Sequence, residues 1–257
     1  MTNSSVILEL KDGITENTVI WKYFNFSSFV SLLVEQKLVF RRLDLFSDKR
    51  DGSLPESIFR EEYRALLQQT DEAEARVIAL RKMRRVEDFK KHSYANCWTI
   101  NDFENYALWK IYLSPEKNGL AIKTTIGKLK KSIDFNPSSD LKISESIVIK
   151  DVSYDQLTES ESSQNNIMAH KNPEYSYESE LRLLIKNQWD WTSREKQIVD
   201  GYNSMPVLFI RVDLNELIES LYVSPFSEYW FEDIFKKLIK DKWPDLGHKI
   251  RFSKIEE

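Results

Sequence analysis

Segments with the pattern of β-strands alternate with amphipathic helical segments along most of this chain, and this alternation limits the fold more than any other feature. We predict strands at 19–23, 37–42, 94–99, 119–124, 180–185, 207–212 and 221–223. Helices are predicted after residue 25, with Asn25 or Ser27 as cap, in the segment 123–131, and at 104–113, 214–220 and 228–242. The polar segment 158–166 predicts a loop, and further strands are expected where apolar residues alternate at Ile143, Ile147, Ile149 and Val152. Elements in this order favour a mixed α/β (α+β) fold, with helices packed on a single mixed β-sheet core.

The segment 56–92 interrupts the alternation with a strongly helical sequence. Apolar residues recur at helical spacing in both halves of this segment, and a polar stretch near 68–72 separates the halves. We therefore predict two helices, inserted at about 56–92 into a single domain that spans residues 1–257. The second helix is rich in arginine and lysine, which either contact phosphate or form a solvated face. The acidic residues between them favour the solvated face.

The composition excludes several classes of protein. With 37 Lys and Arg against 41 Asp and Glu, the chain lacks the basic excess of a dedicated nucleic-acid-binding protein. Cys97 is the only cysteine, so an intrachain disulfide and a cysteine–histidine zinc site are excluded, and we expect no bound metal. No glycine-rich phosphate loop occurs, which excludes a P-loop nucleotide hydrolase. Because the first residues do not resemble a signal peptide and no apolar run approaches the ~20 residues that cross a bilayer, we expect a cytoplasmic protein that does not bind membranes.

Three groups of motifs carry the most specific sequence information. The first group is Trp-Lys-Tyr at 21–23, the Arg-Arg pair at 41–42 and the acidic turn at 44–51. The second group is Asn-Cys-Trp-Thr at 96–99, Trp-Lys-Ile-Tyr at 109–112 and the strand that begins at Gly119. The third group is His-Lys at 170–171, Glu-x-Glu-x-Arg at 178–182 and Leu-Tyr-Val-Ser-Pro at 221–225.

Taken in order, these motifs resemble the bacterial domain-of-unknown-function 2971 family over about four fifths of the chain. The second group matches the pattern most closely, whereas Lys-Arg-Asp-Gly-Ser at 49–53 replaces part of the Asp-Pro-Phe-Glu turn of the family. Members of the family are commonly found beside phage-defence genes, and some resemble abortive-infection proteins. The resemblance implies a defence protein that acts on a nucleic-acid or phage-protein target and is neutralised or activated by a partner protein.

The order of the motifs resembles, more distantly, that of ADP-ribosyltransferases that modify nucleic acids. This second resemblance implies a toxin-like effector that consumes NAD as a cosubstrate, as an ADP-ribosyltransferase or an NAD glycohydrolase. Cleaving the nicotinamide bond builds positive charge on the ribose, so a carboxylate must lie beside the developing oxocarbenium ion. We assign this role to Glu180, with Glu178 as its partner on the same face of a strand. Arg42 is expected to grip the pyrophosphate through paired hydrogen bonds.

Aromatic and basic residues of the same motifs are the expected contacts to NAD. The rings would stack on nicotinamide or on a target base, and the basic groups would face the dinucleotide. These candidates are Lys22, Tyr23, Trp98, Trp109, Tyr112, Lys171 and Arg182. Trp98, Trp109 and Tyr112 have a structural alternative, because large rings are commonly core residues, and Trp98 is the ring most expected in the core. Glu-x-Glu-x-Arg can equally form an exposed sheet face with a cross-strand ion pair, and Arg42 can pair with Asp44, Asp48 or Asp51.

Two other functions stay open on the sequence alone. A metal-dependent nuclease would hold Mg²⁺ on the aspartates at 44, 48 and 51 or on Glu178 and Glu180, with Lys171 near phosphate. A noncatalytic sensor or binding module of a defence system would use an aromatic groove, or the Tyr-Trp-Phe segment at 229–231, to recognise its partner. Cys97 lies in an apolar strand and is expected to be an inert buried thiol, and the three histidines are expected to be structural or on the surface.

Overall fold

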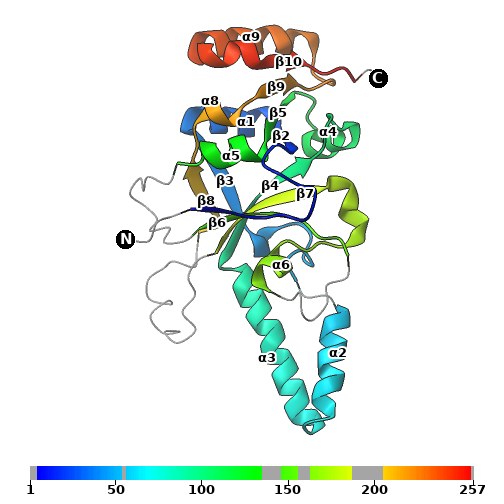
Figure 1. Cartoon of the computed structure of the whole chain (residues 1–257). Helices are drawn as coiled ribbons and strands as arrows, with labels where there is room; N and C mark the ends of the chain where they lie inside the picture. Colours follow the sequence, from blue (N-terminus) through cyan, green and yellow to red (C-terminus); the bar gives the residue numbers. More distant parts are fainter. Residues whose placement is uncertain (1–4, 54–55, 135–145, 156–162, 187–204, 256–257) are drawn as a thin grey trace.

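One mixed β-sheet forms the core of the described part of the chain, which comprises residues 5–53, 56–134, 146–155, 163–186 and 205–255 of the computed structural model (Figure 1). Eight strands follow in the order β1-β6-β7-β4-β2-β5-β9-β10, and β3 pairs with both β4 and β8. The pairs β1–β6 and β9–β10 are parallel, and the other pairs are antiparallel. The predicted mixed α/β fold with a single mixed sheet is confirmed.

The strands lie close to their predicted positions. They are β1 Val6–Glu9, β2 Val19–Asn25, β3 Lys37–Arg42, β4 Ser93–Ile100, β5 Gly119–Thr125, β6 Ile147–Asp151, β7 Glu180–Lys186, β8 Val207–Arg211, β9 Ser220–Val223 and β10 Ile250–Phe252. Two of them, β1 and β10, were not predicted, because three or four residues at the ends of a sheet carry too little alternation to recognise. Of the alternating isoleucines, Ile147 and Ile149 lie in β6, whereas Ile143 falls outside the described residues.

Two different strands, β2 and β3, pair with the same edge of β4. Its C-terminal end pairs with β2, where Trp21 lies opposite Thr99, and its N-terminal end pairs with β3. Between these two pairings the strands fork, and side chains replace the backbone ladder. Lys22 Nζ donates to the carbonyl oxygen of Cys97 at 2.6 Å, and Asn96 Nδ2 donates to the carbonyl oxygen of Val39 at 2.8 Å. These two side chains therefore satisfy backbone carbonyl groups that a neighbouring strand would pair in a continuous sheet.

The two faces of the sheet carry different side chains. Directly paired residues of antiparallel strands point to the same face, so the register of the strands shows which residues share a face. Trp98 lies opposite Leu181 and faces the largest hydrophobic core, which is covered by the helices α1 (Phe26–Glu35), α5 (Ile126–Ser132) and α9 (Tyr229–Lys242). Thr99 lies opposite Glu180, and Cys97 lies opposite Arg182, on the other face. Charged residues of β7 thus point away from the main core, toward the helix α4 (Tyr106–Leu113) and the segment after β6.

The helices begin and end near their predicted bounds. They are α1 Phe26–Glu35, α2 Glu56–Leu67, α3 Glu72–Lys90, α4 Tyr106–Leu113, α5 Ile126–Ser132, α6 Gln164–Met168, α8 Leu214–Leu217 and α9 Tyr229–Lys242. Asn25 caps α1 as predicted, since its Oδ1 accepts from the backbone N–H of Ser28 at 2.9 Å. Helix α6 is a correction: residues 164–166, which we predicted as loop, form its first turn after the cap Ser163. No helix in the described ranges combines the length and the apolar character needed to cross a membrane.

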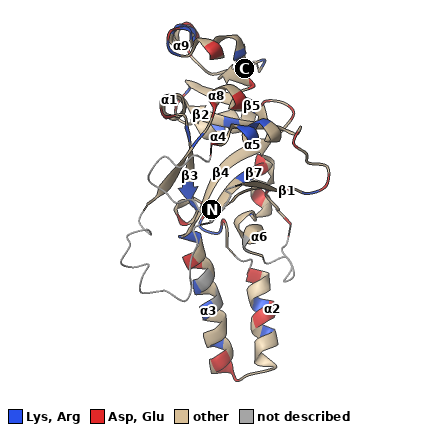
Figure 2. Ribbon diagram, turned by 60° about the vertical axis from the view of Figure 1, so that its left-hand side comes forward, with Lys and Arg blue, Asp and Glu red and all other residues tan. Residues whose placement is uncertain are grey.

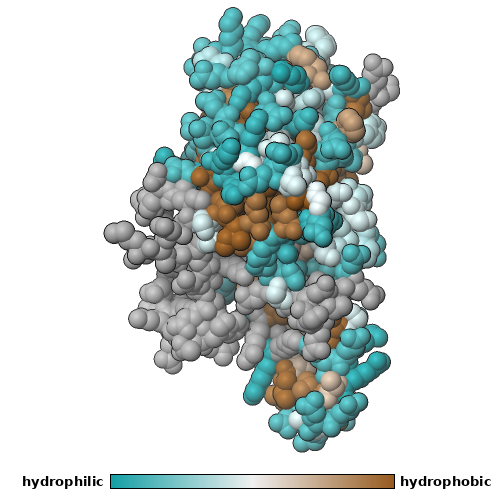
Figure 3. Space-filling model, in the orientation of Figure 1, coloured by the Kyte–Doolittle hydropathy of each residue, from teal (hydrophilic) through white to brown (hydrophobic). Residues whose placement is uncertain are grey.

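Helices α2 and α3 form a hairpin that projects from the sheet (Figures 1 and 2). The break between them, at residues 68–71, lies where the sequence predicted it. Ala75 and Ala79 are the buried apolar residues among the described side chains of α3, whereas Val77 and Leu80 are nearly half exposed. The apolar repeat of α3 therefore marks an exposed stripe beside the face that contacts α2. Hydrophobic surface is visible on the lower, projecting part of the molecule (Figure 3).

Candidate functional site

Arg182 is the centre of a buried network of charges on the second face of the sheet. Its side chain is fully buried, and its Nη1 and Nη2 donate to the two carboxylate oxygens of Asp51 at 2.7 and 2.8 Å. Its Nε and Nη2 donate to the two oxygens of Glu180, both at 3.0 Å, and Nη1 also donates to the carbonyl oxygen of Met168. The guanidinium is thus held between two carboxylates. The structure contradicts the expectation that Arg182 contacts a dinucleotide, because no part of this side chain reaches the surface.

Asp51 reaches Arg182 because the chain after the 3-10 helix η1 Leu43–Leu45 turns back toward the sheet. Gly52 adopts a positive φ of 64° in this turn, a conformation that glycine accepts without strain, and its N–H points to the carbonyl oxygen of His170. The buried Lys90 of α3 closes the turn, since its Nζ donates to the carbonyl oxygen of Lys49 at 2.9 Å and to Ser53 Oγ at 3.0 Å. The base of the hairpin therefore fixes the position of Asp51.

Lys171 joins the two glutamates of the Glu-x-Glu-x-Arg motif. Its Nζ lies 2.6 Å from Glu178 Oε2 and 3.5 Å from Glu180 Oε2, and it also lies over the ring of Tyr175. Glu178 was predicted to share a strand face with Glu180, but it ends the 3-10 helix η3 Pro173–Glu178 instead. Ser179, with φ 42° and ψ 54°, makes the turn into β7. Both carboxylates nevertheless converge on one ammonium group.

The environment shifts the pKa values of these two carboxyl groups in opposite directions. Burial alone would raise the pKa of Glu180, but the charge and hydrogen bonds of Arg182, together with Lys171, lower it from 4.5 to about 2. Burial raises the pKa of Glu178 above 4.5, and the adjacent Glu180 adds to this effect, whereas Lys171 opposes it. Glu180 is therefore a permanent anion near neutral pH, and Glu178 is the carboxyl group that more readily takes up a proton.

Tyrosine side chains surround the carboxylates. The backbone N–H of Glu180 donates to Tyr154 Oη at 2.9 Å, and burial raises the pKa of Tyr154 to about 12. Burial of the Tyr112 hydroxyl, followed by the charge of Glu178, raises the pKa of that tyrosine, although 44% of its residue surface is exposed. Tyr177, beside Glu178, is exposed to a similar extent. Tyr112 and Tyr177 are thus partly exposed tyrosines near the carboxylates.

Cys97 and Lys22 lie beside Glu180, but both have structural roles within the sheet. Burial, and then the charge of Glu180, raises the pKa of the Cys97 thiol well above its usual value, so the thiol stays protonated. Burial lowers the pKa of Lys22, whose Nζ fills the fork and lies over the rings of Phe24 and Trp98. The expected role of Lys22 as an NAD contact has no support in this arrangement.

Arg42 does not join the glutamates, and its predicted role is corrected. Its Nε donates to Asp44 Oδ1 at 2.6 Å, one of the pairings that the sequence left open. On β4, Arg42 lies opposite Tyr94, whereas Glu180 lies opposite Thr99, five residues farther along the strand. An odd separation places the two side chains on opposite faces, and five residues of strand span about 17 Å. Arg42 therefore cannot grip a dinucleotide whose ribose lies beside Glu180.

Most of the candidate stacking rings belong to the core. Trp98 faces the main core, and Tyr23 and Trp109 pack edge to face in a second cluster with ring centroids 4.9 Å apart. Their polar atoms are satisfied within the protein: Trp98 Nε1 donates to the side chain of Asn96, and Tyr23 Oη accepts from the backbone of Asn105. Of the four rings proposed from the sequence, only Tyr112 presents a substantial surface, and its ring lies parallel to Tyr23 at 6.1 Å.

The aspartates proposed as Mg²⁺ ligands have separate partners. Asp44 pairs with Arg42, Asp51 pairs with Arg182, and Asp48 Oδ1 accepts from the backbone N–H of Arg50. Across the described ranges, no three histidine, cysteine or acidic side chains are grouped as metal ligands. In the pair Glu178–Glu180, lysine and arginine groups already occupy carboxylate oxygens that a cation would need.

Sequence reasoning missed Asp51 as the partner of Arg182 and the tyrosines at 154 and 177. Asp51 is separated from Arg182 by 131 positions, and strand periodicity shows which face a residue occupies but not which distant loop meets it. In comparisons with protein-family models, with curated proteins and with solved structures, the chain matches none of them. The family resemblance stays a prediction.

Proposed function

We propose that this protein cleaves the nicotinamide–ribose bond of NAD and transfers the ADP-ribose to a nucleic acid, a protein or water. The observation that carries this proposal is the convergence of Glu178 and Glu180 on Lys171, with pKa values shifted in opposite directions. Two neighbouring carboxyl groups with separated pKa values are the usual arrangement for glycosyl transfer, in which one group moves a proton and the other stays ionised.

The roles follow from the chemistry of the bond. As the bond between C1′ of the ribose and the nicotinamide nitrogen breaks, its electron pair leaves with neutral nicotinamide, and positive charge develops on the ribose. Glu180 is ionised but buried and paired with Arg182 and Lys171, so its charge lowers the energy of this state from within the site and not by direct contact with the ribose. Glu178, the more exposed of the two carboxylates, accepts the proton of the attacking water or target group. Tyr112 and Tyr177 offer their exposed rings to nicotinamide or to a target base.

The biological setting comes from the family resemblance. We place the reaction in the cytoplasm, in bacterial phage defence, where a toxin-like effector needs a target and a partner that neutralises or activates it. Because Arg42 lies on the other face, and Lys171 and Arg182 are engaged with carboxylates, the proposal gives the pyrophosphate no dedicated arginine clamp. We therefore expect weak binding of ADP alone, and a larger contribution to the affinity from the nicotinamide riboside part of NAD.

The test is product analysis of the purified protein incubated with NAD, with and without mixed RNA, DNA and protein targets. Mass spectrometry should detect released nicotinamide together with ADP-ribose or its adduct. Glu178→Gln should remove the proton acceptor and lower turnover by about 10²-fold or more. Glu174→Gln is the matched control, because Glu174 lies exposed on the same 3-10 helix. Equal turnover by both variants, or no turnover by the wild-type protein under any condition, would refute the proposal.

The pH dependence of turnover tests the assigned proton acceptor separately. Glu178 must be ionised to accept a proton, and its pKa is raised above 4.5. Turnover should therefore fall with decreasing pH through an apparent pKa above 4.5, and Glu178→Gln should abolish this limb. An acid limb that survives in the variant would assign the proton transfer to another group.

A second candidate function is a noncatalytic binding module. The observation that favours it is that Arg182 is hydrogen-bonded to both Asp51 and Glu180. A buried arginine held between two carboxylates can also have a purely structural role. For this candidate, a partner should raise the melting temperature of the protein while NAD stays intact. The same product analysis separates the two functions.

A further inference from the structure

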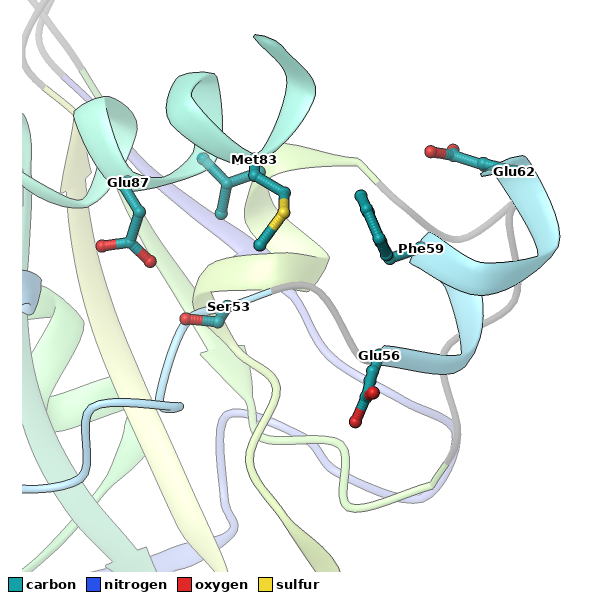
Figure 4. Close-up of a pocket in the computed structure, with 7 residues that line it drawn as sticks. Ser53, Glu56, Phe59, Glu62, Met83 and Glu87 are labelled. Atoms are coloured by element: carbon teal, nitrogen blue, oxygen red, sulfur yellow. The ribbon is translucent and has the colours of Figure 1, made fainter. Parts of the chain in front are cut away.

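Lys90, the last residue of α3, is a buried lysine that has no role in the proposed chemistry. It is 2% exposed, and its Nζ donates to the carbonyl oxygen of Lys49 at 2.9 Å and to Ser53 Oγ at 3.0 Å. Glu87, one turn earlier on α3, lies 3.9 Å from this Nζ, but 57% of its side chain is exposed, so the pair contributes little. Ser53 and Glu87 point toward each other at the base of the hairpin (Figure 4). Two neutral oxygens therefore hold most of the ammonium group.

A buried ammonium group stabilises the base of a hairpin less than an apolar side chain of the same length would. The group loses its hydration in the interior, and neutral oxygens replace that hydration only in part. Methionine would fill most of the same space without this loss. The charge of Lys90 therefore indicates a role other than packing, and its two acceptors indicate which role, because they lie on either side of Asp51 in the sequence.

The turn that carries Asp51 depends on Lys90 for its short contacts. The backbone N–H of Asp51 lies 3.3 Å from the carbonyl oxygen of Asp48, and the N–H of Gly52 lies 3.5 Å from that of His170. Hydrogen bonds of this length are weak. The ammonium group of Lys90 thus fixes the distance between the turn and α3 more firmly than these backbone contacts do.

The end of α3 is itself attached to the sheet. Ser93, the first residue of β4, donates from its Oγ to the carbonyl oxygen of Phe89 at 2.9 Å. Strand β4 pairs along its length with β7, which carries Glu180 and Arg182. Lys90 therefore connects the turn to the same pair of strands that holds the guanidinium group.

We propose that Lys90 is a positioning residue of the candidate site, which holds Asp51 against Arg182 so that Arg182 in turn orients Glu180. With Asp51 in place, the guanidinium group is bound from two sides, by Asp51 at 2.7 and 2.8 Å and by Glu180 at 3.0 Å. Without the ammonium group the turn moves away, and Arg182 loses the partner that fixes its orientation toward Glu180. The effect on turnover rests on the NAD-cleaving function proposed above, whereas the effect on Arg182 does not.

The test compares Lys90→Met with Lys91→Met by NMR measurement of hydrogen exchange at the Nε–H of Arg182. This group donates to Glu180 in the interior, so it is protected from exchange with solvent. Lys91 is the matched control, because it is the next lysine in the chain and its side chain is 53% exposed. Lys90→Met should accelerate this exchange at least about tenfold. Lys91→Met should leave the exchange rate unchanged, and Lys90→Arg, which can donate to the same oxygens, should restore most of the protection.

Two further measurements distinguish positioning from a purely structural role of Lys90. In urea unfolding, Lys90→Met should lower the stability less in the Asp51→Asn background than in the wild type, because the two substitutions act on the same contact. NAD turnover should fall in Lys90→Met and should not fall further in the double variant. If the wild-type protein releases no nicotinamide, the proposed function fails, and the exchange of the Arg182 Nε–H still tests the role of Lys90.

Two results would overturn the proposal. Unchanged exchange of the Arg182 Nε–H in Lys90→Met would show that Lys90 stabilises only the hairpin, and additive losses of stability would show that Lys90 does not act through Asp51. If Lys90→Met does not fold, Ser53→Ala takes its place, because it removes one acceptor and keeps the buried charge. Faster exchange in Ser53→Ala supports the proposal, and unchanged exchange contradicts it.

Discussion

Replacing Asp51 by asparagine removes one of the two carboxylates that neutralise Arg182 in the interior. The Arg182 side chain is fully buried and Asp51 is 2% exposed, so solvent cannot replace the lost charge. Breaking a buried ion pair by removing one partner costs about 3–5 kcal/mol. Because asparagine keeps one acceptor oxygen and Glu180 stays in place, we expect the lower end of that range. A loss of about 3 kcal/mol corresponds to a fall in melting temperature of about 6–12 °C for a chain of this length.

Differential scanning calorimetry and urea unfolding of Asp51→Asn measure this loss. The control is Glu56→Gln, which removes a carboxylate from the exposed pair with Arg60 and should cost less than about 0.5 kcal/mol. Equal effects of the two substitutions would show that Arg182 does not depend on Asp51, and would refute the buried network on which the candidate site rests.

Three further predictions concern stability. Glu180 has a pKa of about 2 in the folded protein and 4.5 as its reference value, so its stabilising contribution is complete above pH 4.5 and is lost as the pH falls toward 2. In a plot of unfolding free energy against pH, Glu180→Gln should remove this fall between pH 4.5 and 2. Gly119→Ala should strongly lower the melting temperature, because an added Cβ would lie 2.6 Å from the carbonyl oxygen of Phe24, a backbone atom that cannot move aside. Asn25→Ala should cost about 1 kcal/mol in urea unfolding, since it removes the cap of α1, whereas Asn25→Ser should recover most of that loss.

The sequence predicted the strands and helices better than the contacts between distant residues. Alternation located β7 and placed Glu180 and Arg182 on one face, because the period of a strand is a local property. Which residues meet Arg182 depends on the turn at Gly52 and on Lys90 of the hairpin, and no periodicity encodes these contacts. The Glu-x-Glu-x-Arg strand was weighed as an exposed face with a cross-strand pair, but it is buried and pairs with a distant loop.

In the candidate site, too, the sequence identified residues better than the contacts between them. Glu178 and Glu180 were selected from their motif and do converge, although a 3-10 helix and a turn at Ser179, not a shared strand, bring them together. Arg42 was selected from its position after a strand, and its assignment failed because an odd offset along β4 placed it on the other face. A motif thus identified the residue types, and the register of the sheet decided which of them can act together.

The opposite shifts of the two carboxyl groups can be measured directly by NMR titration of the protein labelled with ¹³C at its glutamate side chains, with Glu178→Gln and Glu180→Gln used to assign the signals. We predict that Glu178 titrates above pH 4.5 and that Glu180 stays ionised until the pH approaches 2. Two carboxyl groups that titrate together near pH 4.5, or in the reverse order, would contradict the division into a proton acceptor and a permanent anion.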